Sequence, residues 1–443
     1  MAKFPGPKSQ RMLDEIGRYV IAQPQPFVLD LERCEGMYLV TVEGERIFDC
    51  AGYYGSKLIS HNHPRLREPA YLRRLAVAAN NKTANPDFLT PECLEYYRLI
   101  HGLAPACMKN DRLEVYAINS GAEAVENMMK YMINLHHHKQ RRAERESRIH
   151  RFIYFDQAFH GRTVFALNVT QMAQAPGITR DFHGLVSGGN IQTAFPAVDT
   201  DKPREENERI ARQRLDEVDA LLKRFGDEVV GIVVEPLQGA GGQRVALPEF
   251  FRGLSELANK HDVYLGFDEV QTAGGQTGAF FAADLFGLPY PPQVVATGKK
   301  LGCGAVYMLY PMEDRGILDS TWGGTLADMV RFVQEMKVVR DERLIEQVPE
   351  KTAILVAGLE DIARRFRSSI HNPRGLGLYQ GFSLHTPAER DAFLTDALEQ
   401  ENLLLLSAGR RSVRFRPPLD VTTDDIRLLL DKLARVLGSM ANA

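Results

Sequence analysis

The sequence predicts an α/β fold with a mostly parallel central sheet flanked by helices, and a smaller α+β domain built from both chain ends. Two observations lead to this prediction. Between residues 114 and 296, short apolar runs alternate with amphipathic helical patterns, which is typical of a parallel sheet covered by helices. Towards both ends, the pattern changes to a hairpin and to long helices.

Five short segments are expected to be strands, because each is rich in β-branched or aromatic residues and is bounded by polar residues or glycine. They are Glu114–Ile118, Phe152–Phe155, Val229–Val234, Tyr264–Phe267 and Val294–Ala296. Apolar residues at helical spacing lie between several of them, at Ala122–Leu135, Ile210–Phe225 and Pro248–Lys260. Ligands of such sheets bind beyond the carboxyl ends of the strands, so polar residues that directly follow a strand are site candidates.

The chain ends differ from this middle part. Tyr38–Val42 and Arg46–Phe48 flank a Glu-Gly turn and predict a hairpin. The last part of the chain predicts helices at Met329–Asp341, Thr352–Arg365 and Asp424–Leu437. We therefore expect a large domain over residues 51–328 and a small domain formed by residues 1–50 and 329–443.

Composition argues against several classes of protein. Lys and Arg number 54 and Asp and Glu 57, so the chain lacks the basic balance that nucleic-acid binding needs. No apolar run approaches the roughly 18 residues of a membrane helix, and we expect no secretory signal at the N-terminus. Five separate cysteines without a C-x-x-C pair favour a reduced, cytoplasmic protein without a metal site.

Three motifs follow predicted strands. Ser120-Gly121-Ala122-Glu123 shows the capping pattern of a helix start, where free N–H groups can bind an anion; taken alone, the motif is better explained as an ordinary capped helix. Asp268 directly follows an apolar strand, and a buried carboxylate needs a partner, either a protonated cofactor ring nitrogen or a salt bridge. Lys299 follows the next strand, where a half-buried lysine can act as an amine nucleophile; the alternative is a pair of surface lysines, Lys299 and Lys300.

Together, these motifs provide an amine, a carboxylate and a phosphate cradle, which are the three contacts that pyridoxal phosphate needs. The carboxylate would keep the cofactor ring protonated as an electron acceptor, and Lys299 would move the substrate proton. Dinucleotide and nucleotide binding are disfavoured, because the sequence has no G-x-G-x-x-G after a strand and no G-x-x-x-x-G-K-[ST].

From about Phe27 to Leu437, the chain resembles the class III pyridoxal-phosphate aminotransferases. The segments that carry the resemblance are Asn119–Glu126, Ala158–Thr163, Glu235–Gly239, Asp268–Thr272, Gly298-Lys299 and Ser320–Gly324. Asn81–Asn85, Ser320–Arg331 and Val413–Leu419 are similar to the branch that acts on lysine. The resemblance implies fold type I, a homodimer with shared active sites, and ping-pong transfer of the terminal amino group of L-lysine to 2-oxoglutarate.

The resemblance also implies a role for individual residues. Lys299 would form the imine with the cofactor, and Asp268 would pair with the ring nitrogen. The remaining cofactor contacts would be Ser120, Gly121, Ala122, Phe159, Glu235, Gln271 and, across the dimer, Thr321; the substrate contacts would be Arg162, Arg414 and Tyr54.

One departure from the family concerns Ala240. Members that act on terminal amines carry Glu in this segment, where it pairs with the second arginine; here the segment is Gln238-Gly239-Ala240-Gly241-Gly242. Alanine cannot pair with a cation, so Arg414 would lack its usual partner, and an unpaired buried guanidinium is costly. Other class III aminotransferases, a class III racemase or epimerase, and a cofactor-binding scaffold without turnover stay open as alternatives.

Overall fold

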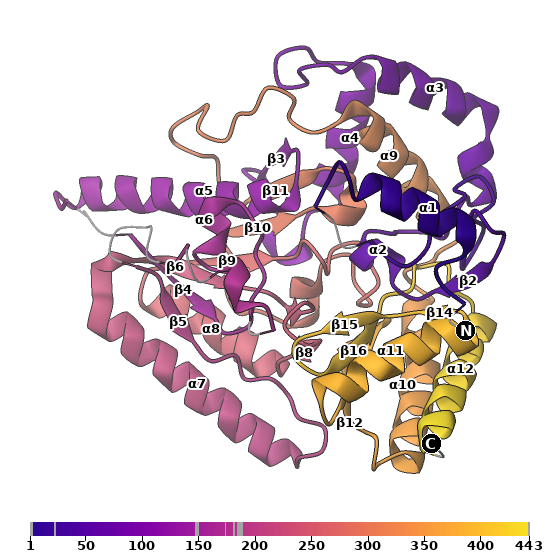
Figure 1. Cartoon of the computed structure of the whole chain (residues 1–443). Coiled ribbons are helices and arrows are strands. Elements are labelled where there is room, and N and C mark those ends of the chain that lie inside the picture. The colour runs from indigo at the N-terminus through magenta and orange to yellow at the C-terminus, as the bar shows by residue number, and fades with distance from the viewer. Residues whose placement is uncertain are drawn as a thin grey trace.

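A seven-stranded sheet forms the centre of the molecule in the computed structural model (Figure 1), with the order β3-β11-β10-β9-β6-β4-β5. The structure describes residues 3–21, 24–146, 150–172, 174–179, 182–183 and 189–441. The strands are β3 (Glu114–Ile118), β4 (Arg151–Phe155), β5 (Ile191–Thr193), β6 (Val229–Val234), β9 (Tyr264–Asp268), β10 (Val294–Thr297) and β11 (Gly304–Met308). Only the β10–β11 and β11–β3 pairings are antiparallel. The prediction of a mostly parallel sheet is therefore confirmed.

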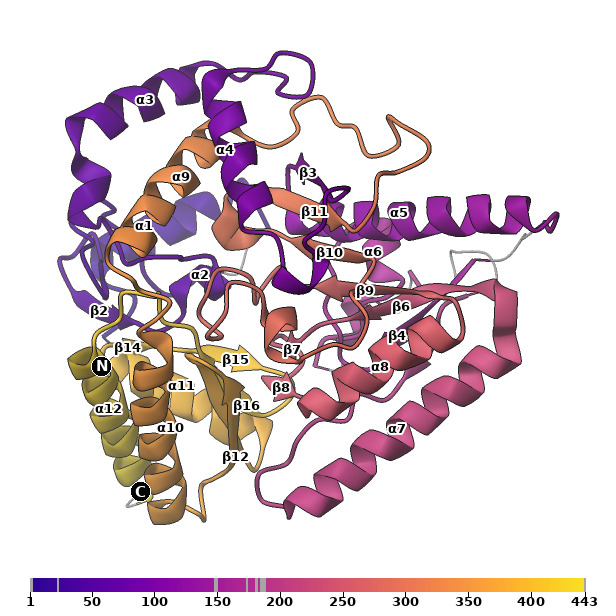
Figure 2. The same ribbon diagram turned by 180° about the vertical axis from the view of Figure 1, so that it is seen from behind.

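Helices cover both faces of this sheet. In both ribbon views the long helix α5 lies on one side, and α7 and α8 lie on the other (Figures 1 and 2). The helices before residue 270 are α1 (Pro7–Ile16), α2 (Gly52–Gly55), α3 (Pro69–Asn80), α4 (Pro91–Gly102), α5 (Gly121–Arg142), α6 (Val164–Leu167), α7 (Arg204–Phe225) and α8 (Pro248–Lys260). Each predicted strand and helix of this part is present, with ends that shift by up to seven residues.

The two chain ends meet in a separate part of the molecule. Here β1 (Tyr38–Val40) pairs with β2 (Arg46–Asp49), and β14 (Leu403–Leu404) adds to β2 in parallel. The indigo N-terminal and yellow C-terminal segments accordingly lie side by side in both views (Figures 1 and 2). The division into domains at residues 50 and 328 stays a prediction.

A four-stranded sheet and four helices complete the C-terminal part. The sheet has the order β12-β13-β16-β15, and its strands are β12 (Ile370–Leu376), β13 (Tyr379–Leu384), β15 (Leu406–Ala408) and β16 (Ser412–Phe415). The helices are α9 (Leu326–Asp341), α10 (Val348–Arg365), α11 (Pro387–Glu401) and α12 (Thr423–Ala441). A short ribbon of β7 (Leu237–Gln238) and β8 (Arg244–Val245) lies between this part and the large sheet.

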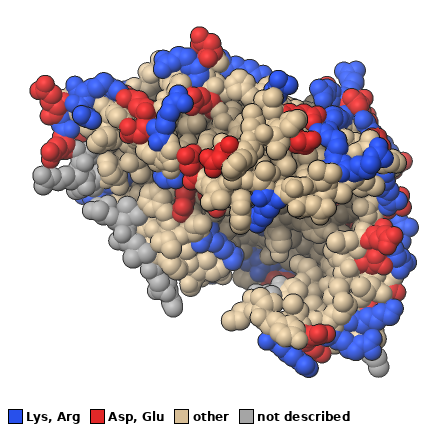
Figure 3. All heavy atoms as spheres, turned by 90° about the horizontal axis from the view of Figure 1, so that it is seen from above, with Lys and Arg blue, Asp and Glu red and all other residues tan. Residues whose placement is uncertain are grey.

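Apolar packing fixes the central sheet from both sides. All six residues of β6 are buried, as expected for a strand covered on both faces. Beneath α8, the Phe251 and Phe286 rings stack with centroids 4.1 Å apart. Over the face shown in Figure 3, acidic and basic side chains are interspersed around a hollow, which agrees with the small net charge.

The strand directions bring several strand ends together at one edge of the sheet, where a site can form. Since β3, β4, β6, β9 and β10 run in the same direction, their carboxyl ends meet at one edge of the sheet. The segments that leave this edge begin with Asn119, Asp156, Glu235, Glu269 and Gly298. Three of the motifs singled out in the sequence therefore converge there.

Candidate active site

A cavity of about 240 Å³ opens at this edge. It brings together eight of the residues that the sequence predicts for the site: Gly121, Ala122, Phe159, Arg162, Glu235, Asp268, Gln271 and Lys299. His160, Gly161 and Val270 complete the lining. The three motifs thus belong to a single site.

Lys299 enters the cavity from the end of β10. Its backbone has a φ of 49°, a conformation that non-glycine residues seldom adopt and that marks many functional sites. Burial, followed by the charges of Arg416 and Arg414, lowers the pKa of Lys299 to about 8. Within the described part of the chain, its amine makes no hydrogen bond or ion pair, so a neutral amine is accessible near physiological pH.

The neighbouring Lys300 has the opposite environment. Its Nζ is buried and donates hydrogen bonds to the carbonyl of Gly55 (3.2 Å), the carbonyl of Gln271 (2.6 Å) and the hydroxyl of Tyr379 (2.9 Å). Burial holds the pKa of Lys300 well below its usual range. The two lysines thus differ in geometry, because one lines the cavity and the other ties loops together behind it.

Asp268 ends β9 and is held from two directions. Its Oδ2 lies 2.7 Å from Nδ1 of His160, and its Oδ1 accepts a hydrogen bond of 3.0 Å from the backbone N–H of Val270. The side chains of Asp268 and His160 are nearly inaccessible to solvent. His160 was not predicted as a site residue, although it lies beside Phe159 in the Ala158–Thr163 segment that carries the family resemblance.

Glu235 follows β6 and lies behind the aromatic wall of the cavity. One carboxylate oxygen accepts a hydrogen bond of 3.0 Å from the backbone N–H of Phe159, which fixes the segment that carries the ring. Burial and the charge of Asp268 raise the pKa of Glu235 well above its usual range. Gln271 lies nearby, and its buried Oε1 has no hydrogen-bond partner among the described residues.

The start of α5 forms a further wall. Ser120 caps the helix by accepting the backbone N–H of Glu123, at 3.3 Å. The carboxylate of Glu123 accepts hydrogen bonds from the backbone N–H and the side-chain amide of Asn119. The predicted capping box is therefore only half formed. The first N–H groups of a helix have no acceptor within it, and Gly121 and Ala122 present them at the cavity wall.

Glycine at position 298 lets β10 approach this helix start. A Cβ at Gly298 would lie 3.0 Å from Cα and 3.2 Å from the backbone nitrogen of Gly121. A larger side chain would separate Lys299 from the start of α5. Close packing against this helix therefore explains why a glycine precedes the lysine.

Two arginines of β16 and the segment after it lie buried near Lys299. Arg414 donates from Nε to the carbonyl of Ser407 at 3.2 Å, and its Nη1 has no partner among the described residues. Arg416 donates to Oε1 of Gln243 at 2.8 Å, while its Nε and Nη1 are unpartnered there. Burial lowers the pKa of Arg414 to about 9 and that of Arg416 to about 10. Sequence reasoning did not single out Arg416.

Four predicted contacts lie outside the cavity lining, namely the buried Arg414 and three others. Ser120 caps the adjacent helix, and Thr321 is exposed on the loop before α9. Tyr54 is 55% exposed. Burial lowers the pKa of Arg414, and the smaller effect of the charge on the Tyr54 phenol acts in the opposite direction. The role of Thr321 across a dimer stays a prediction.

The cavity fits pyridoxal phosphate. An amine without a partner, a fixed carboxylate and the start of a helix line the same space. Phe159 and Val270 add the apolar walls that an aromatic ring needs. Gln271 supplies a buried oxygen that lacks a donor.

The fold and this site define an enzyme of the pyridoxal-phosphate class. A family model described as aminotransferase class-III matches residues 19–437, so the chain belongs to the class III aminotransferases. It is a pyridoxal-phosphate-dependent transaminase that acts on an amino donor and a 2-oxo acid acceptor. The fold class and the cofactor predicted from sequence are thereby confirmed.

Similar proteins include L-lysine-epsilon aminotransferases and 4-aminobutyrate aminotransferases. The L-lysine-epsilon aminotransferase of Mycobacterium tuberculosis is 32% identical over 429 residues, covering 94% of this chain and 93% of that protein. That of Amycolatopsis lactamdurans is 29% identical, covering 98% and 97%. A solved lysine aminotransferase from M. tuberculosis, in the internal aldimine form, superimposes with a TM-score of 0.90 at 29% identity, covering 97% and 99%.

The described part of the chain shows neither a metal-binding cluster nor a membrane-spanning helix. Across the described residues, no group of three or more His, Cys, Asp or Glu side chains could hold a metal ion. In that same part of the chain, no helix is long and apolar enough to cross a membrane.

Proposed function

We propose that this transaminase transfers the terminal amino group of L-lysine to 2-oxoglutarate in two half-reactions at one site. The accessible amine of Lys299 opposite the His160–Asp268 pair carries the chemical part of this proposal. The choice of lysine is supported by relatives named L-lysine-epsilon aminotransferase that are aligned over nearly the whole chain.

The residues of the cavity divide the chemistry between them. Pyridoxal phosphate, when bound, supplies an electrophilic carbon and an electron-accepting ring. Lys299 would hold the cofactor and move the substrate proton at Nζ, because its lowered pKa allows it both to take and to give a proton near pH 8. Asp268 would hold the ring nitrogen, and the start of α5 would bind the phosphate.

Substrate binding would use guanidinium groups. Arg162 lines the cavity, and Arg414 is buried behind it; a guanidinium binds a carboxylate through two parallel hydrogen bonds. We propose that both arginines bind substrate carboxylates and that Tyr54 lines the substrate entrance.

A second candidate function is favoured by Ala240. No carboxylate pairs with Arg414 or Arg416 among the described residues, so the two charges remain available to any substrate. This arrangement favours donors that keep a carboxylate on Arg414 in both half-reactions, such as another amino acid or a 4-amino acid.

The test is a panel of donors with the purified holoenzyme, scored by the spectral conversion of the bound cofactor. L-Lysine should convert the cofactor faster than ornithine, 4-aminobutyrate or a simple amine, and 2-oxoglutarate should restore it. Conversion by another donor alone would support the second candidate. Inversion of one enantiomer without a 2-oxo acid would instead identify a racemase, and a lack of any conversion would identify a scaffold.

We further propose a homodimer with shared active sites, as the resemblance implies, in which Thr321 reaches the cofactor phosphate of the partner subunit. The exposure of Thr321 and of Trp322 on the loop before α9 supports this proposal. Sedimentation would give the mass of the holoenzyme. Thr321→Ala should then weaken cofactor binding without changing that mass.

A further inference from the structure

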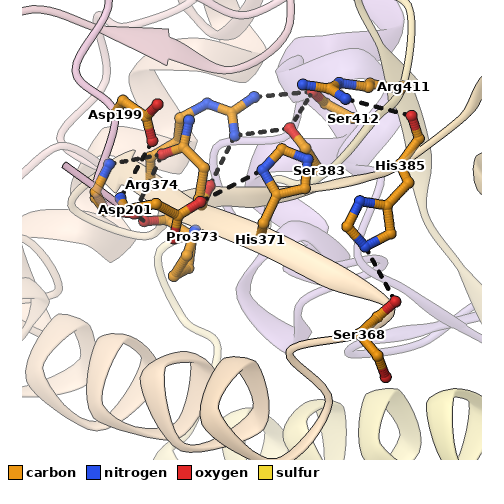
Figure 4. Close-up of polar contacts among 12 residues, drawn as sticks. Asp199, Asp201, Ser368, His371, Pro373, Arg374, Ser383, His385, Arg411 and Ser412 are labelled. Atoms are coloured by element: carbon orange, nitrogen blue, oxygen red, sulfur yellow. Dashed lines mark hydrogen bonds and ion pairs between the residues drawn. The ribbon is translucent and has the colours of Figure 1, made fainter.

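A second cavity, of about 350 Å³, lies between the four-stranded sheet and the segments that lead to α7 and β8. It shares no lining residue with the cavity of Lys299. Its size lies at the lower end of the range of small-molecule sites. Figure 4 shows part of its lining as a network of arginine, serine, histidine and aspartate side chains.

A polar row across three neighbouring strands forms the floor of this cavity. His371 of β12 lies opposite Ser383 of β13, which lies opposite Ser412 of β16. The register shifts between His371 and Arg374, and such an irregularity commonly redirects a side chain beside a site. The polar row faces the cavity instead of packing into the apolar core.

Arg374 is the most buried charge of this cavity, with 7% of its surface exposed. Its guanidinium donates to the hydroxyls of Ser383 (3.0 Å) and Ser412 (2.8 Å), as Figure 4 shows. It also donates to the carbonyls of Asn372 (2.7 Å) and Gly242. All four acceptors are neutral. They fix the guanidinium in place and leave its positive charge without a counter-ion.

The charges around Arg374 do not balance. Four guanidiniums line the cavity, those of Arg244, Arg374, Arg410 and Arg411, and the one carboxylate in the lining is that of Asp199. One pair is closed within the protein, since Arg244 lies 3.2 Å from Asp156. Burial lowers the pKa of His371, which lies 3.4 Å from Asp201, so a neutral ring leaves that carboxylate charged. The charges of Asp199 and Asp201 act on Arg374, but neither forms an ion pair with it.

The guanidiniums of Arg410 and Arg411 are open to a ligand, whereas the Nη groups of Arg374 are taken by its four neutral acceptors. In the described ranges, Arg374, Arg410 and Arg411 form no ion pair, and Arg411 donates only to the carbonyl of His385, at 3.2 Å. Burial and the charges of Arg244 and Arg411 lower the pKa of Arg374 to about 10. An uncompensated positive charge held this far from solvent is costly unless an anion joins it.

We propose that this cavity binds a small organic dianion, a phosphate monoester or a dicarboxylate, between Arg374 on the floor and Arg410 and Arg411 at the rim. The fixed charge of Arg374 would attract the anion, and the forked N–H groups at the rim would close on its oxygens. This binding site does not depend on the substrate proposed above, so its test is separate from the test of that substrate.

Calorimetric titration of the pyridoxal-phosphate-loaded enzyme tests the proposal, with glycerol 2-phosphate and succinate as probes and sodium chloride as the ionic control. The test variant is Arg410→Gln with Arg411→Gln, because both side chains are exposed and neither lines the cavity of Lys299. Arg343→Gln, at a surface arginine that is 77% exposed, is the matched control. Arg410→Gln alone serves as a second variant, and melting temperatures show that each variant is folded.

We expect saturable binding of at least one probe, with a Kd about tenfold or more higher in the double variant, intermediate in Arg410→Gln and unchanged in Arg343→Gln. Binding of glycerol 2-phosphate alone would identify a phosphate ligand, and binding of succinate alone a dicarboxylate. The absence of saturable binding, or equal affinity in the double variant, would overturn the proposal.

Discussion

Nδ1 of His160 lies 2.7 Å from Oδ2 of Asp268, and both side chains are almost fully buried. The backbone N–H of Val270 binds the other carboxylate oxygen. A carboxylate with a hydrogen bond on each oxygen has a fixed orientation, so the pair presents Asp268 to the cavity in one position. His160 therefore acts on the chemistry through Asp268, as a positioning residue.

The first prediction concerns this pair. Asp268→Asn should lower kcat by roughly 100- to 1,000-fold, because it removes a charge aimed at the reacting system. His160→Phe should have a smaller effect, about 10- to 100-fold, as for other residues that orient a functional group. Single-turnover kinetics with the best donor measures both effects, and the melting temperature serves as control. Equal losses in the two variants would contradict a purely orienting role for His160.

The second prediction separates the two adjacent lysines. Lys299→Ala should abolish the covalent cofactor adduct that borohydride reduction leaves on the protein, and should lower turnover by at least about 10,000-fold. Lys300→Met should keep the adduct, although it should lower the melting temperature because three buried acceptors lose their donor. Peptide mapping of the reduced protein shows which residue is labelled. A label on residue 300 in the wild-type protein would reverse the assignment.

The third prediction follows from the lowered pKa of Lys299, which is about 8. Below that pH, the neutral fraction of the amine rises about tenfold per pH unit, and above it the fraction levels off. The rate of cofactor uptake by the apoenzyme should follow the same curve. A rate that continues to climb towards pH 10 would indicate an ordinary lysine.

The lowered pKa of Lys299 also predicts how the stability of the apoenzyme changes with pH. The unfolded chain holds the proton of this lysine up to about pH 10.4, whereas the folded apoenzyme loses it near pH 8. The unfolded state therefore binds more protons between these values, and this group makes the apoenzyme more stable as the pH rises through that window. Lys299→Ala should remove this contribution from urea unfolding curves recorded at pH 7.5 and pH 9.5.

Much of this site could be predicted from sequence, because its residues directly follow strands of a parallel sheet. Asp268 and Lys299 were found in this way, since a charged residue after an apolar run is a local signal. Arg416 was not found, although it is among the largest fully buried side chains. Its surroundings, Gln243 and Tyr379, come from distant parts of the chain, and no local pattern brings them together.

The elements missed in sequence have a similar explanation. β5 has three residues, two of them polar, and β11 follows a glycine-rich segment, so neither shows a clear strand pattern. α5 continues to Arg142, seven residues beyond the predicted end. His136 within this extension is fully buried. The polar residues of these last turns are compatible with a helix end, but the sequence indicates a solvated one. Tertiary packing instead buries His136 and Gln140.

The fourth prediction tests the contact between β10 and α5. Gly298→Val should push Lys299 away from the helix start, because a Cβ alone already lies 3.0 Å from Gly121. The affinity for pyridoxal phosphate should fall about tenfold or more, together with the melting temperature. Gly102→Ala, whose Cβ would meet no atom within 4 Å, is the control. Unchanged cofactor affinity in Gly298→Val would show that this approach does not shape the phosphate site.

The fifth prediction concerns Ala240 and Arg414, which both contact the segment around β15. The carbonyl of Ala240 accepts the N–H of Gly409, and Arg414 donates to the carbonyl of Ser407. Ala240→Glu should supply the carboxylate that Arg414 lacks, and it should then compete with the carboxylate of a 2-oxo acid. Charge-assisted hydrogen bonds are worth about 1.5–3 kcal/mol, so KM for 2-oxoglutarate should rise roughly 10- to 100-fold. Ala240→Gln adds the same volume without the charge; a similar rise in KM for this variant would show that bulk, and not pairing with Arg414, causes the effect.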